Sequence, residues 1–133
     1  VLEIYNLKDS THVVRIGPHG EPKFKVAEGY GIPTGIMGFC DVQVTDSAIY
    51  AVFQGRTFKE ITEATQRGDM TDGGWYVYVF SLEGEPLRKY ELDHAIYGMF
   101  VDGQFRTLVV VDINKDEPMV KFCCNKEKYT LGK

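Results

Sequence analysis

The chain has few cysteines and only a small excess of acidic over basic residues. Its three cysteines, Cys40, Cys123 and Cys124, are an odd number with one adjacent pair, and adjacent cysteines form a disulfide only with strain. We therefore expect all three to be small core residues. The formal net charge is −4, with both signs mixed along the chain, so no basic patch is available for nucleic acid or an anionic membrane surface. Basic partners are not excluded.

Long apolar runs and complete catalytic or metal-binding motifs are also absent. No run approaches the roughly 20 apolar residues of a membrane span, and the first residues lack the basic-then-apolar pattern of a signal peptide. Because the sequence opens at Val1 in a strand-like phrase, we expect a mature or excised fragment whose targeting segment lay upstream. His12, His19 and His94 are scattered, and no serine sits in a Gly-x-Ser-x-Gly elbow. The sequence therefore predicts no cofactor, no metal and no catalytic residue.

Two partial motifs are better explained as a turn and a loop. Residues Asp112–Asp116 begin like a calcium-binding loop, but the positions that need glycine and glutamate hold Glu117 and Cys123. A hairpin turn closed by Pro118 is the simpler interpretation. The glycine-rich segment Gly29–Gly38 does not follow a strand and open a helix, as a phosphate-binding loop must, so it is interpreted as a flexible crossing between strands.

What the chain does have is repeated β-strand patterning. The phrases Ile4–Leu7, Val79–Leu82 and Val120–Cys123 each alternate and lead into a short charged turn. Hydrophobic residues make up 44% of the chain, enough for a packed core. Alternation with β-branched and aromatic enrichment predicts ten strands, at Val1–Leu7, Thr11–Ile16, Asp41–Thr45, Ala48–Gln54, Trp75–Leu82, Leu87–Leu92, Ile96–Val101, Thr107–Asp112, Met119–Cys124 and Lys128–Leu131.

A recurring strand-pair unit joined by tight turns is typical of radially repeated β architecture. We therefore predict an all-β fold made of four-stranded antiparallel blades in an incomplete β-propeller ring. Residues 1–133 would be a single fragment in which 1–16 end one blade, 40–93 form a full blade and 94–131 form the next. Open blade faces and edges predict self-association of the fragment. Inward-facing apolar side chains are expected at Val42, Val44, Ile49, Val79 and Leu108.

Two long insertions, Gly17–Phe39 and Gly55–Gly74, interrupt this rhythm. In an antiparallel blade both connections emerge on the same side, and functional residues concentrate on loops, so this side is the predicted binding face. Within the second insertion, Lys59–Arg67 is expected to form one or two helical turns ending at Gly68.

Aromatic and cationic side chains on this face suit recognition of a protein, a peptide or a glycan. The candidate ligand-binding residues are Tyr30, Arg56, Arg67 and Trp75. The alternative is that Trp75 packs within its blade and that the charged side chains are only solvated.

A family resemblance is concentrated between Phe39 and Asp102. The phrases Ile49–Arg56, Val77–Phe80 and Gly84–Asp93, followed by Ile96, resemble the TolB-like six-bladed β-propeller proteins of Bacteroidetes. In that family an Ile-Tyr-Ala strand, a Gly-Arg pair and a Gly-x-Pro-x-x-x-Tyr-x-Leu-Asp phrase recur at about this spacing. The resemblance implies propeller architecture and an exported, often lipid-anchored protein of the periplasm or cell surface. It supplies no established chemistry.

Together these observations favour an extracytoplasmic β-propeller module that binds or scaffolds a ligand or protein on the face of the long loops. The alternative is a fragment of an enzyme whose active site, at the mouth of the propeller channel, is completed by other blades.

Overall fold

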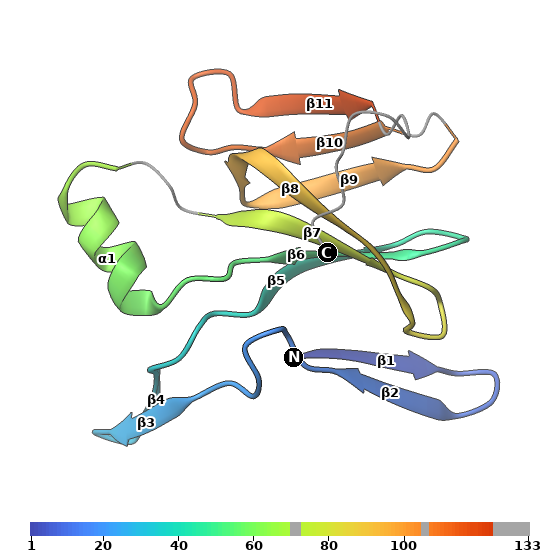
Figure 1. The fold of residues 1–133 in the computed structure, drawn as a ribbon, viewed down its shortest axis with the longest axis horizontal. Coiled ribbons are helices and arrows are strands. Elements are labelled where there is room, and N and C mark those ends of the chain that lie inside the picture. Colours follow the sequence, from blue (N-terminus) through green and yellow to red (C-terminus); the bar gives the residue numbers. More distant parts are fainter. Residues whose placement is uncertain (70–72, 105–106, 124–133) are drawn as a thin grey trace.

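The computed structural model describes residues 1–69, 73–104 and 107–123. It is built from antiparallel sheets with one short helix in this part of the chain, which confirms the all-β prediction (Figure 1). The central sheet has four strands in sequence order: β5 (Phe39–Val44), β6 (Ile49–Phe53), β7 (Gly74–Phe80) and β8 (Pro86–Ile96). Figure 1 shows a three-stranded sheet on one side of it and a hairpin on the other.

The three-stranded sheet follows the central sheet directly in the chain. It contains β9 (Gly98–Asp102), β10 (Thr107–Val111) and β11 (Met119–Cys123), and a single residue, Tyr97, separates β9 from β8. The hairpin on the opposite side is β1 (Leu2–Asn6) paired with β2 (Thr11–Arg15). A two-stranded, a four-stranded and a three-stranded sheet stacked in this order fit an incomplete propeller ring. The strand predicted at Lys128–Leu131 lies outside the described residues.

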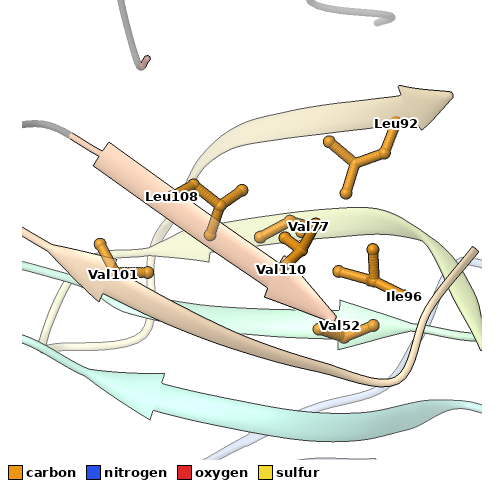
Figure 2. Packing of buried hydrophobic residues seen from close by; sticks show 7 residues of the cluster. All are labelled: Val52, Val77, Leu92, Ile96, Val101, Leu108 and Val110. Atoms are coloured by element: carbon orange, nitrogen blue, oxygen red, sulfur yellow. The ribbon is translucent and has the colours of Figure 1, made fainter. Parts of the chain in front are cut away.

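The main core lies between the central sheet and the three-stranded sheet (Figure 2). Val52 and Val77 point from β6 and β7 toward Leu108 and Val110 on β10. β-branched residues suit this position because they fill a pleated, buried surface with little loss of rotamer freedom. Each such side chain stabilises the fold by about 1.5–3 kcal/mol when fully buried. The two sheets therefore share one core and are held together by it.

A second, smaller core lies on the other face of the central sheet. Leu2 from β1 packs with Ile49, Ala51 and Phe80, because successive residues of a strand point to opposite faces. The hairpin of β1 and β2 is also tied to the turn after β7, where the Arg15 guanidinium donates to the Gly84 carbonyl.

The predicted inward positions were correct on β6, β7 and β10 and wrong on β5. Ile49, Val79 and Leu108 are buried, whereas Val42 and Val44 are 43% and 62% exposed. Both valines do lie on the face that carries the hairpin, but β1 packs against β6 and β7 and leaves these two positions of β5 uncovered. A groove of about 520 Å³ remains beside β1, with Val42, Val44 and Ile49 among its walls.

The expectation of core cysteines was also wrong where the structure describes them. Cys40 and Cys123 are both exposed, and Cys124 lies outside the described residues. Cys40 falls where the pairing of β5 with β6 shifts register, between Phe39 and Asp41, so strict alternation does not place its side chain. Its thiol donates to the Val52 carbonyl at 3.7 Å. Cys123 is the last residue of β11.

The first insertion contains a hairpin that was not predicted. Strands β3 (Phe24–Ala27) and β4 (Tyr30–Pro33) pair antiparallel around Glu28 and Gly29. Both turn residues have positive φ, 53° and 81°, as a two-residue type I′ turn requires. Glycine adopts this conformation readily and glutamate rarely does, so the signal was weak in the sequence.

The helix in the second insertion is slightly longer than predicted. Helix α1 (Phe58–Gln66) has nine residues, which is about two and a half turns at 3.6 residues per turn. It ends as expected near Gly68, which has a positive φ of 80°. Ala64 is its buried residue, so α1 contributes little to either core and mainly shapes the surface beside it.

Candidate functional site

The two insertions lie together on one side of the molecule. Figure 1 shows α1 and the hairpin of β3 and β4 on the same side, while the tight β1–β2, β5–β6 and β7–β8 turns lie on the other. The backbone joins the two insertions: Met37 N donates to Arg56 O at 2.8 Å, and Gly55 N donates to Met37 O at 3.0 Å. An isolated β-bridge pairs Ile36 with Thr57. We call this side the loop face.

One hollow on the loop face lies over the ring of Phe53. It encloses about 400 Å³ and includes His19, Glu21, Lys23 and Thr57 among its polar lining residues. The imidazole of His19 stacks on Phe53, with the ring centroids 6.3 Å apart. Gly17 is required beneath the ring because a Cβ there would lie 2.7 Å from the ring of Phe53. This hollow offers hydrogen-bonding groups and side chains of both charges, Glu21 and Lys23, above an aromatic floor.

A second hollow lies beside the first, at the start of β5 and the end of β6. It encloses about 280 Å³ and shares Gly38 with the first hollow. Its other lining residues include Phe39, Cys40, Gln54 and Tyr97, none of which carries a formal charge at neutral pH. The second hollow therefore suits a neutral group with both apolar and hydrogen-bonding character.

The first turn of α1 borders the first hollow but satisfies its own backbone donors. Thr57 and Glu60 form a capping box: Glu60 N donates to Thr57 Oγ1 at 3.2 Å, and Thr57 N donates to Glu60 Oε2 at 2.7 Å. Hydrogen bonds from the backbone N–H and hydroxyl of Thr57 lower the pKa of Glu60 below its ordinary value of 4.5. The Glu60 carboxylate thus already occupies the place an external anion would take.

The four residues predicted to bind a ligand are spread over the loop face and the central sheet. Tyr30 is 74% exposed beside the turn between β3 and β4. Arg56 is half-buried between the insertions, where its guanidinium donates to Gly73 O at 3.5 Å. Arg67 follows α1 and pairs with Asp69 at 3.2 Å. Trp75 is half-buried in β7, two residues from buried Val77.

These four side chains are not brought into one site. The two hollows are lined by other described residues, so the predicted four could contribute only at their margins. The sequence argument missed His19, Lys23, Gln54 and Tyr97. The available signal was positional, because His19 and Lys23 lie within the first insertion and Gln54 ends the predicted strand Ala48–Gln54, directly before the second insertion.

A third polar cluster joins the central sheet to the three-stranded sheet. His94 on β8 lies with its Nδ1 3.0 Å from Oδ2 of buried Asp112. The other Asp112 oxygen accepts from the backbone and side-chain nitrogens of Asn114, at 3.0 Å and 2.8 Å. Burial opposes ionisation of Asp112, but these hydrogen bonds outweigh it and hold its pKa below the ordinary value of 3.8.

This cluster is the turn predicted from the partial calcium motif. Asp112 N donates to Pro118 O at 2.8 Å and Lys115 N donates to Asp112 O at 3.2 Å, so the aspartate closes the connection between β10 and β11. Over residues 1–69, 73–104 and 107–123, no group of three or more His, Cys, Asp or Glu side chains is arranged to hold a metal ion.

Comparison with known proteins gives one family match. The family described as TolB-like 6-blade propeller-like matches residues 1–104. Neither the curated proteins nor the solved structures contain a match. Within the part of the chain that the structure describes, there is no helix of the length and apolar character that a membrane span requires.

Proposed function

The chain belongs to the TolB-like 6-blade propeller-like family, and on that premise we propose that it is a binding module that recognises a protein or peptide on its loop face. The observation that carries the proposal is the joining of two insertions, distant in the sequence, by backbone hydrogen bonds between Met37, Gly55 and Arg56. Ordering these loops costs conformational entropy. The sheets do not need ordered insertions for their own packing. A recognition surface explains the cost.

The lining of the loop face supports a macromolecular partner that inserts side chains into it. The two adjacent hollows, of about 400 and 280 Å³, are each the size of one or two side chains. The first is lined by Glu21, Lys23 and His19 and the second by neutral groups, which favours a partner that presents a polar or charged residue beside an uncharged one. Tyr30, Arg56, Arg67 and Trp75 would add contacts around the hollows.

The family and the surface chemistry extend the proposal in two ways. We place the module outside the cytoplasm, in the periplasm or at the cell surface, because of the resemblance to exported propellers. Self-association of the 133-residue chain is also part of the proposal, since Val42 and Val44 leave an apolar strand face exposed.

Photo-crosslinking tests the proposal directly. A photoreactive amino acid at Tyr30 reports on the loop face, and one at Leu7 reports on the opposite side with similar access, since these residues are 74% and 93% exposed. In extract from the native source we expect one defined partner to crosslink at Tyr30 and not at Leu7. Replacing Lys59–Asp72 with a short glycine linker should remove that crosslink while circular dichroism stays β-rich. Equal crosslinking from both positions, or a crosslink that survives the replacement, would refute it.

A further inference from the structure

Two glutamines lie toward opposite ends of the β5–β6 hairpin and differ in what they bind. Gln43 on β5 forms two hydrogen bonds with the peptide backbone of Val101 on β9. Gln54 is only 6% exposed, and its Oε1 accepts no hydrogen bond from any described residue. A buried amide oxygen without a donor costs about 1–3 kcal/mol. Such a group in a folded protein calls for an explanation.

The backbone of Gln54 is anchored by a hydrogen bond, whereas its side-chain amide is attached through a soft torsion. Its backbone N donates to Gly38 O at 2.9 Å, which holds the residue against the first insertion. The terminal torsion of a glutamine side chain has a broad energy profile, so a small rotation re-aims the amide at low cost. Gln54 lines the second hollow together with Phe39, Cys40 and Tyr97. Gln54, whose amide oxygen has no partner among the described residues, therefore borders a space large enough for a ligand.

We propose that the second hollow is a subsite for the backbone N–H and C=O of one residue in an extended partner segment, and that Gln54 is the residue that binds them. In this subsite the N–H of the bound residue donates to Gln54 Oε1 while Gln54 Nε2 donates to the C=O of the same residue. Gln43 already makes this two-point contact with Val101 inside the protein, at 2.8 Å and 3.3 Å. The inference rests on the proposed function and names the chemical group that the loop face reads.

The other properties of the hollow fit a neutral peptide group and disfavour charged ligands. No lining residue carries a formal charge, so a carboxylate or ammonium group would lose its hydration without a partner of opposite charge. Phe39 and Tyr97 supply apolar surface for the side chain next to the bound peptide group. A volume of about 280 Å³ leaves room for one side chain of moderate size.

The test compares two small probes that differ by one atom. N-acetylvaline N-methylamide carries the backbone N–H and C=O of one valine residue, and its ester analogue replaces the valine N–H by an oxygen. Titrated into the 15N-labelled 133-residue protein, the amide should shift the signals of residues 37–40, 54 and 97, including the Gln54 side-chain NH2. The ester should bind about ten-fold more weakly, because it cannot donate to Oε1.

A pair of variants assigns the effect to Gln54. Gln54→Met keeps the length of the side chain and removes both hydrogen bonds, so amide binding should fall about ten-fold. The matched control, Gln66→Met, changes an exposed glutamine on α1 and should leave binding unchanged. If Gln54→Met does not fold, the amide and ester comparison on the unaltered protein decides alone.

Three results would overturn the inference: no binding of the amide, equal binding of amide and ester, or full binding by a folded Gln54→Met protein. Any of them would mean that only water satisfies Gln54. The crosslink at Tyr30 separates the two proposals. If the crosslink forms but the amide does not bind, the loop face still recognises a partner, and the second hollow is not the site.

Discussion

Gln43 on β5 binds both polar backbone groups of Val101 on β9, accepting from Val101 N at 2.8 Å and donating to Val101 O at 3.3 Å. Two residues earlier on each strand, Met99 N donates to Asp41 Oδ2 at 3.0 Å. Both contacts span 58 residues of sequence. Side chains thus join the first strands of two successive sheets, in place of the backbone ladder that operates within each sheet.

Replacing Gln43 should weaken the fold measurably. Gln43→Met removes both hydrogen bonds and leaves the backbone groups of Val101, a buried residue, without these partners. We expect a loss of about 1–3 kcal/mol in the free energy of unfolding, measured by urea titration. Gln66→Met, on the exposed side of α1, should change it by less than about 0.5 kcal/mol. Equal stability of the two variants would show that the Gln43 contacts contribute nothing.

The pH dependence of stability should report on Asp112. Its pKa in the folded protein is lowered, since hydrogen bonds from His94 and Asn114 outweigh the effect of burial. A lowered pKa means that the carboxylate stabilises the fold above its unfolded pKa, and that this stabilisation is lost as the pH falls through the folded value. The window therefore begins near the ordinary value of 3.8 and extends below it.

Asp112→Asn tests this sign. The variant should be less stable than the unaltered protein by about 1–3 kcal/mol at neutral pH, and the gap should close as the pH falls below about 4. Asp116→Asn, at an exposed position of the same turn, should show a small and constant difference. A gap for Asp112→Asn that widens in acid would contradict the assignment.

Gly73 should tolerate no side chain. Its φ is +122°, and a Cβ would lie 2.5 Å from the carbonyl oxygen of Ile96, which belongs to the backbone and cannot turn aside. Gly73→Ala should cost about 3 kcal/mol or more in thermal or urea unfolding. Gly68→Ala provides the control, because Gly68 also has a positive φ, of +80°, but faces open space. It should cost only about 1 kcal/mol.

Strand positions were predictable because alternation is a local property. β6, β7 and β10 are rich in β-branched and aromatic residues, and each formed where the sequence placed it. Alternation also put Val42 and Val44 on the correct face of β5. It could not tell whether that face is covered, because coverage depends on β1, which is distant in the sequence.

The position of the loop face was predictable from the sequence, but the residues that line its hollows were not. Insertion lengths showed where loops gather, and the backbone bonds of Met37 confirmed that the two insertions meet. The hollows themselves arise from pairs such as Gln54 and Gly38, which lie 16 residues apart and have no local pattern in common. Nothing in the local sequence marks Gln54 as buried or His19 as stacked on Phe53.

The single-residue junction at Tyr97 constrains how the protein folds and unfolds. β8 ends at Ile96 and β9 begins at Gly98, so the two sheets have no linker that would let one move while the other stays intact. Ile96 belongs to the same core as Val101 and Val110. Unfolding of either sheet would expose to water the apolar surface that it covers on the other. The four-stranded and three-stranded sheets should therefore behave as one cooperative unit, acquiring and losing amide protection together in hydrogen exchange.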